Sequence, residues 1–230
     1  MDSETLKAIL LAVPVLLFSF AAHEYAHAWA ALSQGDPTAR DAGRLTLNPL
    51  KHIDPFMTIL VPAAMLIASH GQSALGGAKP CPVQPRNYRN YRRGDIIVSL
   101  AGVTMNLFLA LSSTVLFFVI GVIGHDVGGA REALTFAQDM LVVAVQLNLL
   151  LVFFNLLPIP PLDGSHVIKH FLPPNLALAY VRVSRYGILV LLALIYFGGP
   201  LLNWWLGPSE SLAHLLLALV RPYYLGIGAS

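Results

Sequence analysis

The sequence predicts an all-α protein, a polytopic transmembrane helix bundle with a re-entrant or partly inserted segment at about residues 56–69. Three observations predict this class: 56% of the 230 residues are hydrophobic, only 11% are charged, and the mean hydropathy is +0.67. A soluble domain carries roughly 25% charged residues, so the low charge excludes a water-soluble globule. A disordered chain would have low hydrophobicity, so the composition excludes disorder as well. The net charge of +2 is too small to indicate a nucleic-acid partner. The single cysteine, Cys81, excludes an internal disulfide and a Cys-rich metal cluster.

Six apolar stretches predict the individual elements of the bundle. They occupy about residues 8–32, 56–69, 96–121, 135–158, 187–206 and 211–225. A full helical crossing needs about 20 residues, and the first, third, fourth and fifth stretches have that length. The second is shorter and contains Pro62, so we expect it to enter and leave without crossing. The sixth is also short, and we expect it to lie at the membrane interface.

Basic residues predict the orientation, because cytoplasmic loops carry an excess of Lys and Arg. The loops at 33–55, 70–95 and 159–186 are basic, whereas the N-terminus and the loop at 122–134 are not. If all three basic loops are cytoplasmic, the segment at 56–69 must enter and leave on the same side. The N-terminus is then extracytoplasmic.

An HExxH motif, His23-Glu24-Tyr25-Ala26-His27, lies inside the first apolar stretch. Histidines four residues apart on a helix differ by about 40° in direction, so both imidazoles can reach one zinc ion. Glu24 projects from a neighbouring direction, where it can take a proton from zinc-bound water. Ionisable residues inside a membrane span are costly and usually functional, and a hydrogen-bonded cluster without metal is the alternative.

A third zinc ligand is needed, because catalytic zinc takes three protein ligands and keeps a fourth position for water. The best candidate is Asp163, in the stretch NLLPIPPLDG at 155–164. Its prolines cannot continue a regular helix, and unwound backbone at membrane depth survives only where protein or a polar cavity satisfies it. Asn155 can hold the unwound chain or donate a hydrogen bond to a substrate carbonyl. A purely structural turn is the alternative. In the predicted topology, His27 and Asp163 reach the same side of the bilayer.

The combination of HEYAH in an apolar helix with NLLPIPPLDG further along the chain resembles the site-2 protease family of intramembrane zinc metalloproteases. Residues 43–55 and the tripeptide at 78–80 resemble a compact prokaryotic branch of this family, without PDZ or CBS domains. The resemblance implies one zinc ion per chain. It implies roles for five residues: His23, His27 and Asp163 as zinc ligands, Glu24 as general base, and Asn155 as a substrate or oxyanion contact.

The resemblance also implies an activity and a location. We expect hydrolysis of peptide bonds in or near transmembrane segments of membrane-protein substrates, as in regulated intramembrane proteolysis. We expect a multi-pass protein of the prokaryotic plasma membrane, with the active site toward the cytoplasmic side. A single membrane domain is expected over 1–230, with a catalytic core at about 8–168 and accessory C-terminal helices at about 176–225.

One departure and one rival function accompany this interpretation. The family's third span commonly reads A-G-P-x-x-N, whereas Val103 stands at the proline position here and Asn106 is kept, which leaves the local helix shape open. The rival is an ion- or proton-coupled membrane transporter that uses the intramembrane His, Glu and Asp cluster. Such carriers usually contain internal repeats, and no second segment like either motif is present in the sequence.

Overall fold

The computed structural model describes residues 3–52, 79–124 and 128–226, and within these ranges it contains helices and no β-strand. The predicted all-α class is therefore confirmed. The predicted re-entrant segment at 56–69 lies outside the described residues. The chain forms two compact units, Leu17–Gly102 on the one hand and Met1–Leu16 with Val103–Ser230 on the other.

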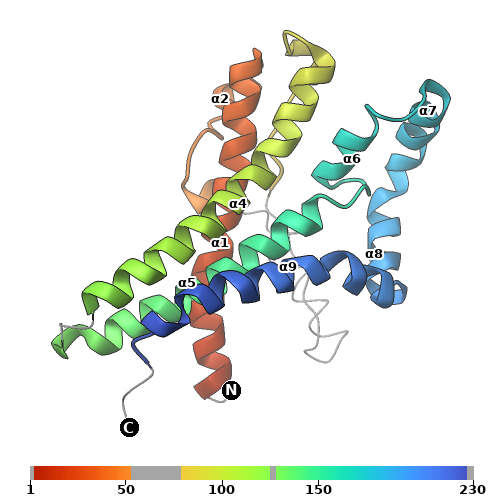
Figure 1. Cartoon of the computed structure of the whole chain (residues 1–230). Helices are drawn as coiled ribbons and strands as arrows, with labels where there is room; N and C mark the ends of the chain where they lie inside the picture. The colour runs from red at the N-terminus through yellow and green to blue at the C-terminus, as the bar shows by residue number, and fades with distance from the viewer. Residues whose placement is uncertain (1–2, 53–78, 125–127, 227–230) are drawn as a thin grey trace. The chain divides into compact units, whose positions relative to one another are not determined.

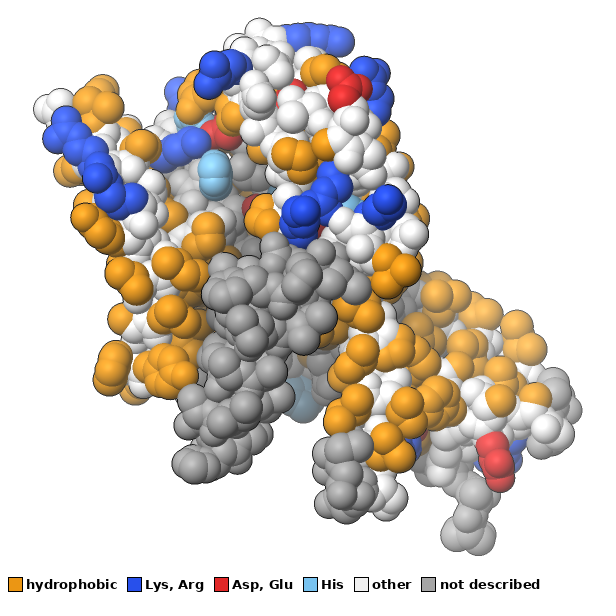
Figure 2. Space-filling model, turned by 180° about the vertical axis from the view of Figure 1, so that it is seen from behind, with side chains coloured by type: hydrophobic (Ala, Val, Ile, Leu, Met, Phe, Trp, Pro, Cys, Tyr) orange, Lys and Arg blue, Asp and Glu red, His pale blue; other side chains and the backbone are white. Residues whose placement is uncertain are grey.

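Four helical stretches of the described residues are long and apolar enough to cross a membrane. They are Leu6–Gln34, Tyr91–Gly124, Arg131–Asn155 and Pro174–Phe197. Figure 2 shows hydrophobic side chains spread over one face of the molecule. Exposed large hydrophobic residues include Phe108, Ile123 and Trp204. In water so much exposed apolar surface would be unfavourable, whereas lipid tails accept it. The protein is an integral membrane protein.

The unit Leu17–Gly102 is built around two long helices. Its elements are the larger part of α1 (Ser3–Gln34), α2 (Thr38–Asp41), the 3-10 turns η1 (Pro49–Lys51) and η3 (Pro85–Asn87), and the start of α4 (Tyr91–Gly124). Ala30 and Ala31 of α1 form a buried cluster with Tyr88 and with Val98 of α4. Such small residues let two membrane helices approach closely.

Asp36 ties together the two loops of this unit. Its side chain is wholly buried, and its carboxylate accepts hydrogen bonds from the backbone N–H of Gln84 at 2.6 Å and from the side-chain amide of Asn87 at 2.8 Å. Thr38, at the start of α2, donates its backbone N–H to the same carboxylate at 3.2 Å. Burial alone would raise the pKa of Asp36, but these hydrogen bonds outweigh burial and hold the pKa below its ordinary value of 3.8.

The unit that contains Val103–Ser230 is a helical bundle around α5 (Figure 1). After the second part of α4, its elements are the turn η4 (Gly128–Ala130), α5 (Arg131–Asn155), α6 (Asp163–Ile168), α7 (Pro174–Val183), the turn η5 (Ser184–Tyr186), α8 (Gly187–Phe197), α9 (Gly199–Val220) and the turn η6 (Arg221–Tyr223). Val145 and Leu149 of α5 are buried against Ala110 of α4 and Ala213 of α9. Helix α9 therefore lies along α5.

An amide pair joins α4 to α5 inside this apolar bundle. The side-chain amide of Asn106 donates to the side-chain oxygen of Asn148 at 2.8 Å, and both residues are buried. Polar side chains in membrane helices find such partners on neighbouring helices. Helix α4 runs from Tyr91 to Gly124 without a break, so Val103 in place of the family's proline leaves the helix regular.

The predicted boundaries of the last two apolar stretches, 187–206 and 211–225, are wrong. Helix α8 ends at Phe197, and α9 continues from Gly199 to Val220. The break lies at Gly198, and Pro200 stands in the first turn of α9, where its missing N–H costs no helical hydrogen bond. Average hydropathy does not register a break between two adjacent apolar helices.

Candidate functional site

The two histidines of the HExxH motif lie together on one face of α1. His23 and His27 are buried, and their Nε2 atoms are 2.9 Å apart. Their rings stand at 79° to each other, with centroids 4.6 Å apart. Because residues four apart share a helix face, α1 alone brings two imidazole nitrogens to one point, as the motif predicts.

Helix α4 orients one of these rings. The Nδ1 atom of His27 lies 2.7 Å from the carbonyl oxygen of Val98. A carbonyl oxygen only accepts, so Nδ1 carries the proton and Nε2 carries the lone pair. Metal-binding histidines usually donate their second N–H to a carbonyl or carboxylate in this way.

Gly102 of α4 lies against the same two rings. A Cβ atom built on Gly102 would lie 2.5 Å from Nε2 of His27 and 2.6 Å from Nε2 of His23, closer than real side-chain carbons approach other atoms. The space beside both nitrogens therefore exists because residue 102 has no side chain. The site therefore fits a zinc ion in three respects. The Nε2 atoms of His23 and His27 converge, Nδ1 of His27 carries its proton on the opposite side of the ring, and Gly102 leaves space beside both Nε2 atoms.

Glu24 lies next to His23 on α1 and is half-buried. Its Oε2 atom accepts a hydrogen bond from the backbone N–H of Cys81 at 2.6 Å. Cys81 lies between Pro80 and Pro82, and proline has no N–H. Cys81 therefore supplies the one backbone donor among these three residues, and that donor holds the Glu24 carboxylate.

The stretch 79–84, which carries this donor, is fixed at its far end. Val83 packs against the buried cluster of α1 and α4, and the N–H of the next residue, Gln84, donates to Asp36. Asp36 lies two residues after the end of α1, so both contacts set the position of the stretch relative to the helix that bears Glu24. Burial, followed by the charge of Glu24, raises the pKa of the Cys81 thiol to about 12, so the thiol is neutral at pH 7.

Asn155 is the last residue of α5, in the other compact unit. Its side-chain amide donates to the carbonyl of Leu151 in the same helix at 3.0 Å. The nearby carbonyl of Phe153 accepts from the indole N–H of Trp205 at 2.8 Å. This hydrogen bond lies within α5, and both roles that the sequence left open for Asn155 stay predictions.

Asp163 is the first residue of α6, after the proline-rich turn. The turn is compact: a Cβ on Gly164 would lie 2.7 Å from the carbonyl oxygen of Leu157. The carbonyl of Pro158 accepts from the hydroxyl of Tyr180 at 3.0 Å. Protein groups thus satisfy part of the unwound backbone, as expected at membrane depth. Asp163 and the histidines belong to different compact units, and its role as a third ligand stays a prediction.

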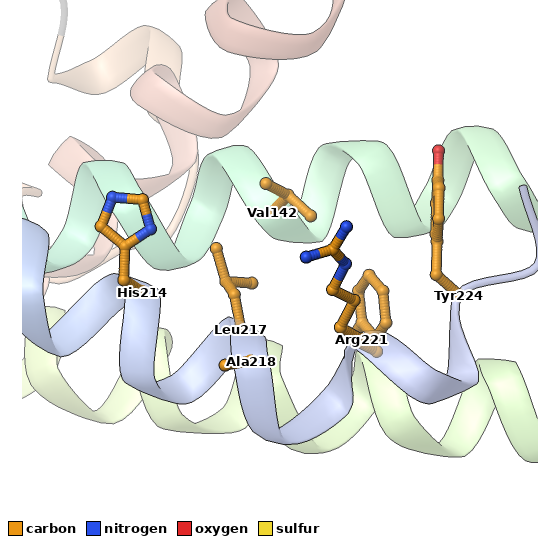
Figure 3. A pocket seen from close by; sticks show the side chains of 7 residues that line it. Val142, His214, Leu217, Ala218, Arg221 and Tyr224 are labelled. Carbon is orange, nitrogen blue, oxygen red and sulfur yellow. The ribbon is translucent and has the colours of Figure 1, made fainter. Parts of the chain in front are cut away.

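A hollow of about 450 Å³ lies against α5 and α9 (Figure 3). His214 of α9 and Arg221 of η6 project into it, beside Val142 of α5 and Tyr224. The residues that line it include none from either zinc signature. We therefore place the candidate site at the HExxH motif and not in this hollow.

Sequence reasoning missed three groups around the motif: the Val98 carbonyl, Gly102 and the Cys81 N–H. The carbonyl is part of the backbone and has no signature in the sequence. Gly102 was visible as part of the Ala101-Gly102 pair, but its contact depends on how α4 crosses α1. The Pro80-Cys81-Pro82 pattern could have indicated a rigid stretch with a single donor.

Comparison with known proteins identifies relatives of this chain. A family model described as Peptidase family M50 matches residues 119–198. The chain is 38% identical over 216 residues to a Bacillus subtilis (strain 168) protein named "Putative zinc metalloprotease YwhC", and the match covers 91% of this chain and 92% of the relative.

Two mycobacterial proteins named "Putative zinc metalloprotease Rip2" are also similar. The one from Mycolicibacterium smegmatis is 33% identical over 196 residues, which cover 85% of this chain and 70% of the relative. The one from Mycobacterium tuberculosis (strain H37Rv) is 32% identical over 192 residues, with 82% and 67% covered. No solved structure matches the chain significantly.

Proposed function

Because the chain belongs to peptidase family M50, the site-2 protease family of membrane zinc metalloproteases, we propose that it cleaves peptide bonds in or near transmembrane segments of membrane-protein substrates. The observation that carries this proposal is the convergence of the His23 and His27 imidazoles inside α1, which is itself long and apolar enough to cross a membrane. A peptide bond cleaved there must come to membrane depth, and membrane-protein substrates meet this requirement.

We assign His23, His27 and Asp163 as the ligands of one zinc ion. The first two are supported by their geometry, and Asp163 by its place in the second signature, directly after the unwound turn. Bound zinc supplies a Lewis acid that polarises the scissile carbonyl and lowers the pKa of a water molecule.

Glu24 acts as the general base in this proposal. Its carboxylate takes a proton from the attacking water, whose oxygen bonds to the carbonyl carbon, and delivers that proton to the leaving amine as the C–N bond breaks. The Cys81 N–H holds one carboxylate oxygen, which leaves the other for the water. Asn155 donates one amide hydrogen to Leu151, and its second amide hydrogen is assigned to the developing oxyanion.

The active site faces the cytoplasm in this proposal. Two loops predicted to be cytoplasmic are joined by the hydrogen bonds from Gln84 and Asn87 to Asp36. In addition, the N–H of Lys79 donates to the carbonyl of His52 at 2.8 Å. These contacts support a common side for both loops, next to the end of α1 that carries the motif. A membrane-impermeant thiol reagent should label a cysteine placed at exposed Asp41 in lysed cells and not in intact cells.

Glu24→Gln tests the function. The variant should keep about one zinc per chain, because Glu24 is not among the assigned ligands, and should lose cleavage of a purified transmembrane reporter. Asp163→Ala should lose both zinc and cleavage. Full proteolysis by Glu24→Gln would contradict the assigned base. A chain that binds no zinc but carries ion flux in vesicles would favour the transporter.

A further inference from the structure

Gly102 of α4 lies against the two imidazoles of the motif. It stands 75 positions after His27 in the sequence, and only the crossing of α4 over α1 brings it there. A built Cβ would meet Cε1 of His23 and the two Nε2 atoms, at 2.5 Å for His27 and 2.6 Å for His23, and these nitrogens are the atoms that the proposed function assigns to zinc. Gly102 is thus in direct contact with the metal-binding ends of both side chains.

The size of the displacement that a side chain would force follows from these distances. Non-bonded carbon and nitrogen atoms settle about 3.5 Å apart, so a Cβ at 2.5–2.6 Å would push the ring nitrogens away by about 1 Å. Functional groups must be held within about 0.5 Å of their working geometry. The displacement of about 1 Å that one added methyl group would cause is therefore larger than the zinc-binding geometry of His23 and His27 tolerates.

The rings rather than the helices would give way. An imidazole is the far end of a side chain that can rotate about two bonds, whereas α1 and α4 are held by the buried cluster of Ala30, Ala31 and Val98. Alanine is also preferred over glycine inside a helix by about 1 kcal/mol. A glycine at this buried helical position therefore costs helix stability, and the contact with the rings accounts for its presence.

We propose that Gly102 is a positioning residue of the zinc site: its missing side chain is the space that lets His23 and His27 converge on one ion. This inference rests on the proposed role of the two histidines as zinc ligands. In this proposal, Gly102 of the Ala101-Gly102 pair contributes to metal binding in addition to close helix packing.

Metal binding of the purified full chain tests the proposal, without any measurement of proteolysis. Gly102→Ala should bind zinc about 10–100-fold more weakly than the unaltered chain. Changes to groups that support metal ligands typically cause a loss of this size. The rise in melting temperature on adding zinc should disappear as well, since a ligand stabilises only the state that binds it. His23→Ala is the reference for a chain without the site.

Gly121→Ala is the matched control in the same helix. A Cβ there would overlap the backbone carbonyl of Tyr223 and lie 2.7 Å from its Cβ, so this variant creates an equally severe clash away from the histidines. It should lower the melting temperature and leave zinc affinity unchanged. Gly207→Ala, where no atom lies within 4 Å of the built Cβ, should change neither.

A double-mutant cycle that measures stability tests the proposal if Gly102→Ala folds poorly. The double variant Gly102→Ala/His23→Ala removes one of the two clashing rings, so it should regain stability that the single glycine variant loses. Unchanged zinc affinity in Gly102→Ala, or a double variant no more stable than the single, would overturn the inference. If instead His23→Ala keeps its zinc, the ligand assignment fails, and the two failures are distinguishable.

Discussion

The hydrogen bond from the Cys81 N–H to Glu24 predicts that removing one backbone hydrogen will impair the enzyme. Cys81→Pro removes the N–H, and Cys81→Ala keeps it. The N–O distance is 2.6 Å, and a hydrogen bond to a charged carboxylate contributes about 1.5–3 kcal/mol. At 1.4 kcal/mol per factor of ten, we expect kcat/KM to fall about 10–100-fold in Cys81→Pro.

The alanine variant isolates this effect from the loss of the thiol. Burial, and then the charge of Glu24, raises the pKa of Cys81 to about 12, so replacing the neutral thiol at pH 7 removes no charge. Residues 79–84 lie outside any helix or strand, so a proline at position 81 interrupts no helical hydrogen bond. The assay is cleavage of a transmembrane reporter by purified protein, with zinc content measured in parallel. Equal losses in both variants, or full activity in Cys81→Pro, would show that the N–H does not position Glu24.

Two further predictions concern buried polar groups, one in each compact unit. Asp36→Asn should destabilise the protein by about 2 kcal/mol at pH 7, the usual value of a hydrogen bond to a charged group. Since the folded pKa of Asp36 lies below 3.8, its stabilisation is present above that pH and is lost as the pH falls through the folded pKa. The difference in free energy of unfolding between variant and parent, measured in detergent, should therefore shrink below about pH 4. A difference that stays constant from pH 7 to pH 3 would contradict the conclusion that hydrogen bonds to the carboxylate lower the pKa of Asp36. Asn106→Leu should lower the free energy of unfolding by about 1–2 kcal/mol, because Asn148 loses a buried hydrogen-bond partner. Replacing both Asn106 and Asn148 by leucine should cost less than the sum of the two single replacements. Additive losses of stability in thermal unfolding would mean that the two residues are not coupled.

Much of the fold could be predicted from composition and apolar run length. The helices around the first, third and fourth stretches were expected because each run is long enough to span a bilayer. The boundary between α8 and α9 was not, because two adjacent apolar helices give one hydropathy signal. Only the backbone conformation around Gly198 shows where one helix ends and the next begins.

Within the candidate site, the linear motif was sufficient to predict the pair of histidines. Their spacing of four residues places both on one face of any α-helix, so local geometry alone brings their Nε2 atoms together. The same local reasoning places Glu24 beside them. Chemistry that depends on neighbours within one helical turn can be deduced from a linear motif.

The groups that hold these residues in place come from long-range contacts of the folded chain. The Val98 carbonyl, Gly102 and the Cys81 N–H lie more than 50 positions from the motif, and each acts through backbone atoms or through a missing side chain. Such groups leave no pattern of residue types in the sequence, because any residue has a carbonyl and almost any has an N–H. Their roles arise from the crossing of α4 over α1 and from the hydrogen bonds of Asp36, which are long-range contacts that a linear motif does not encode.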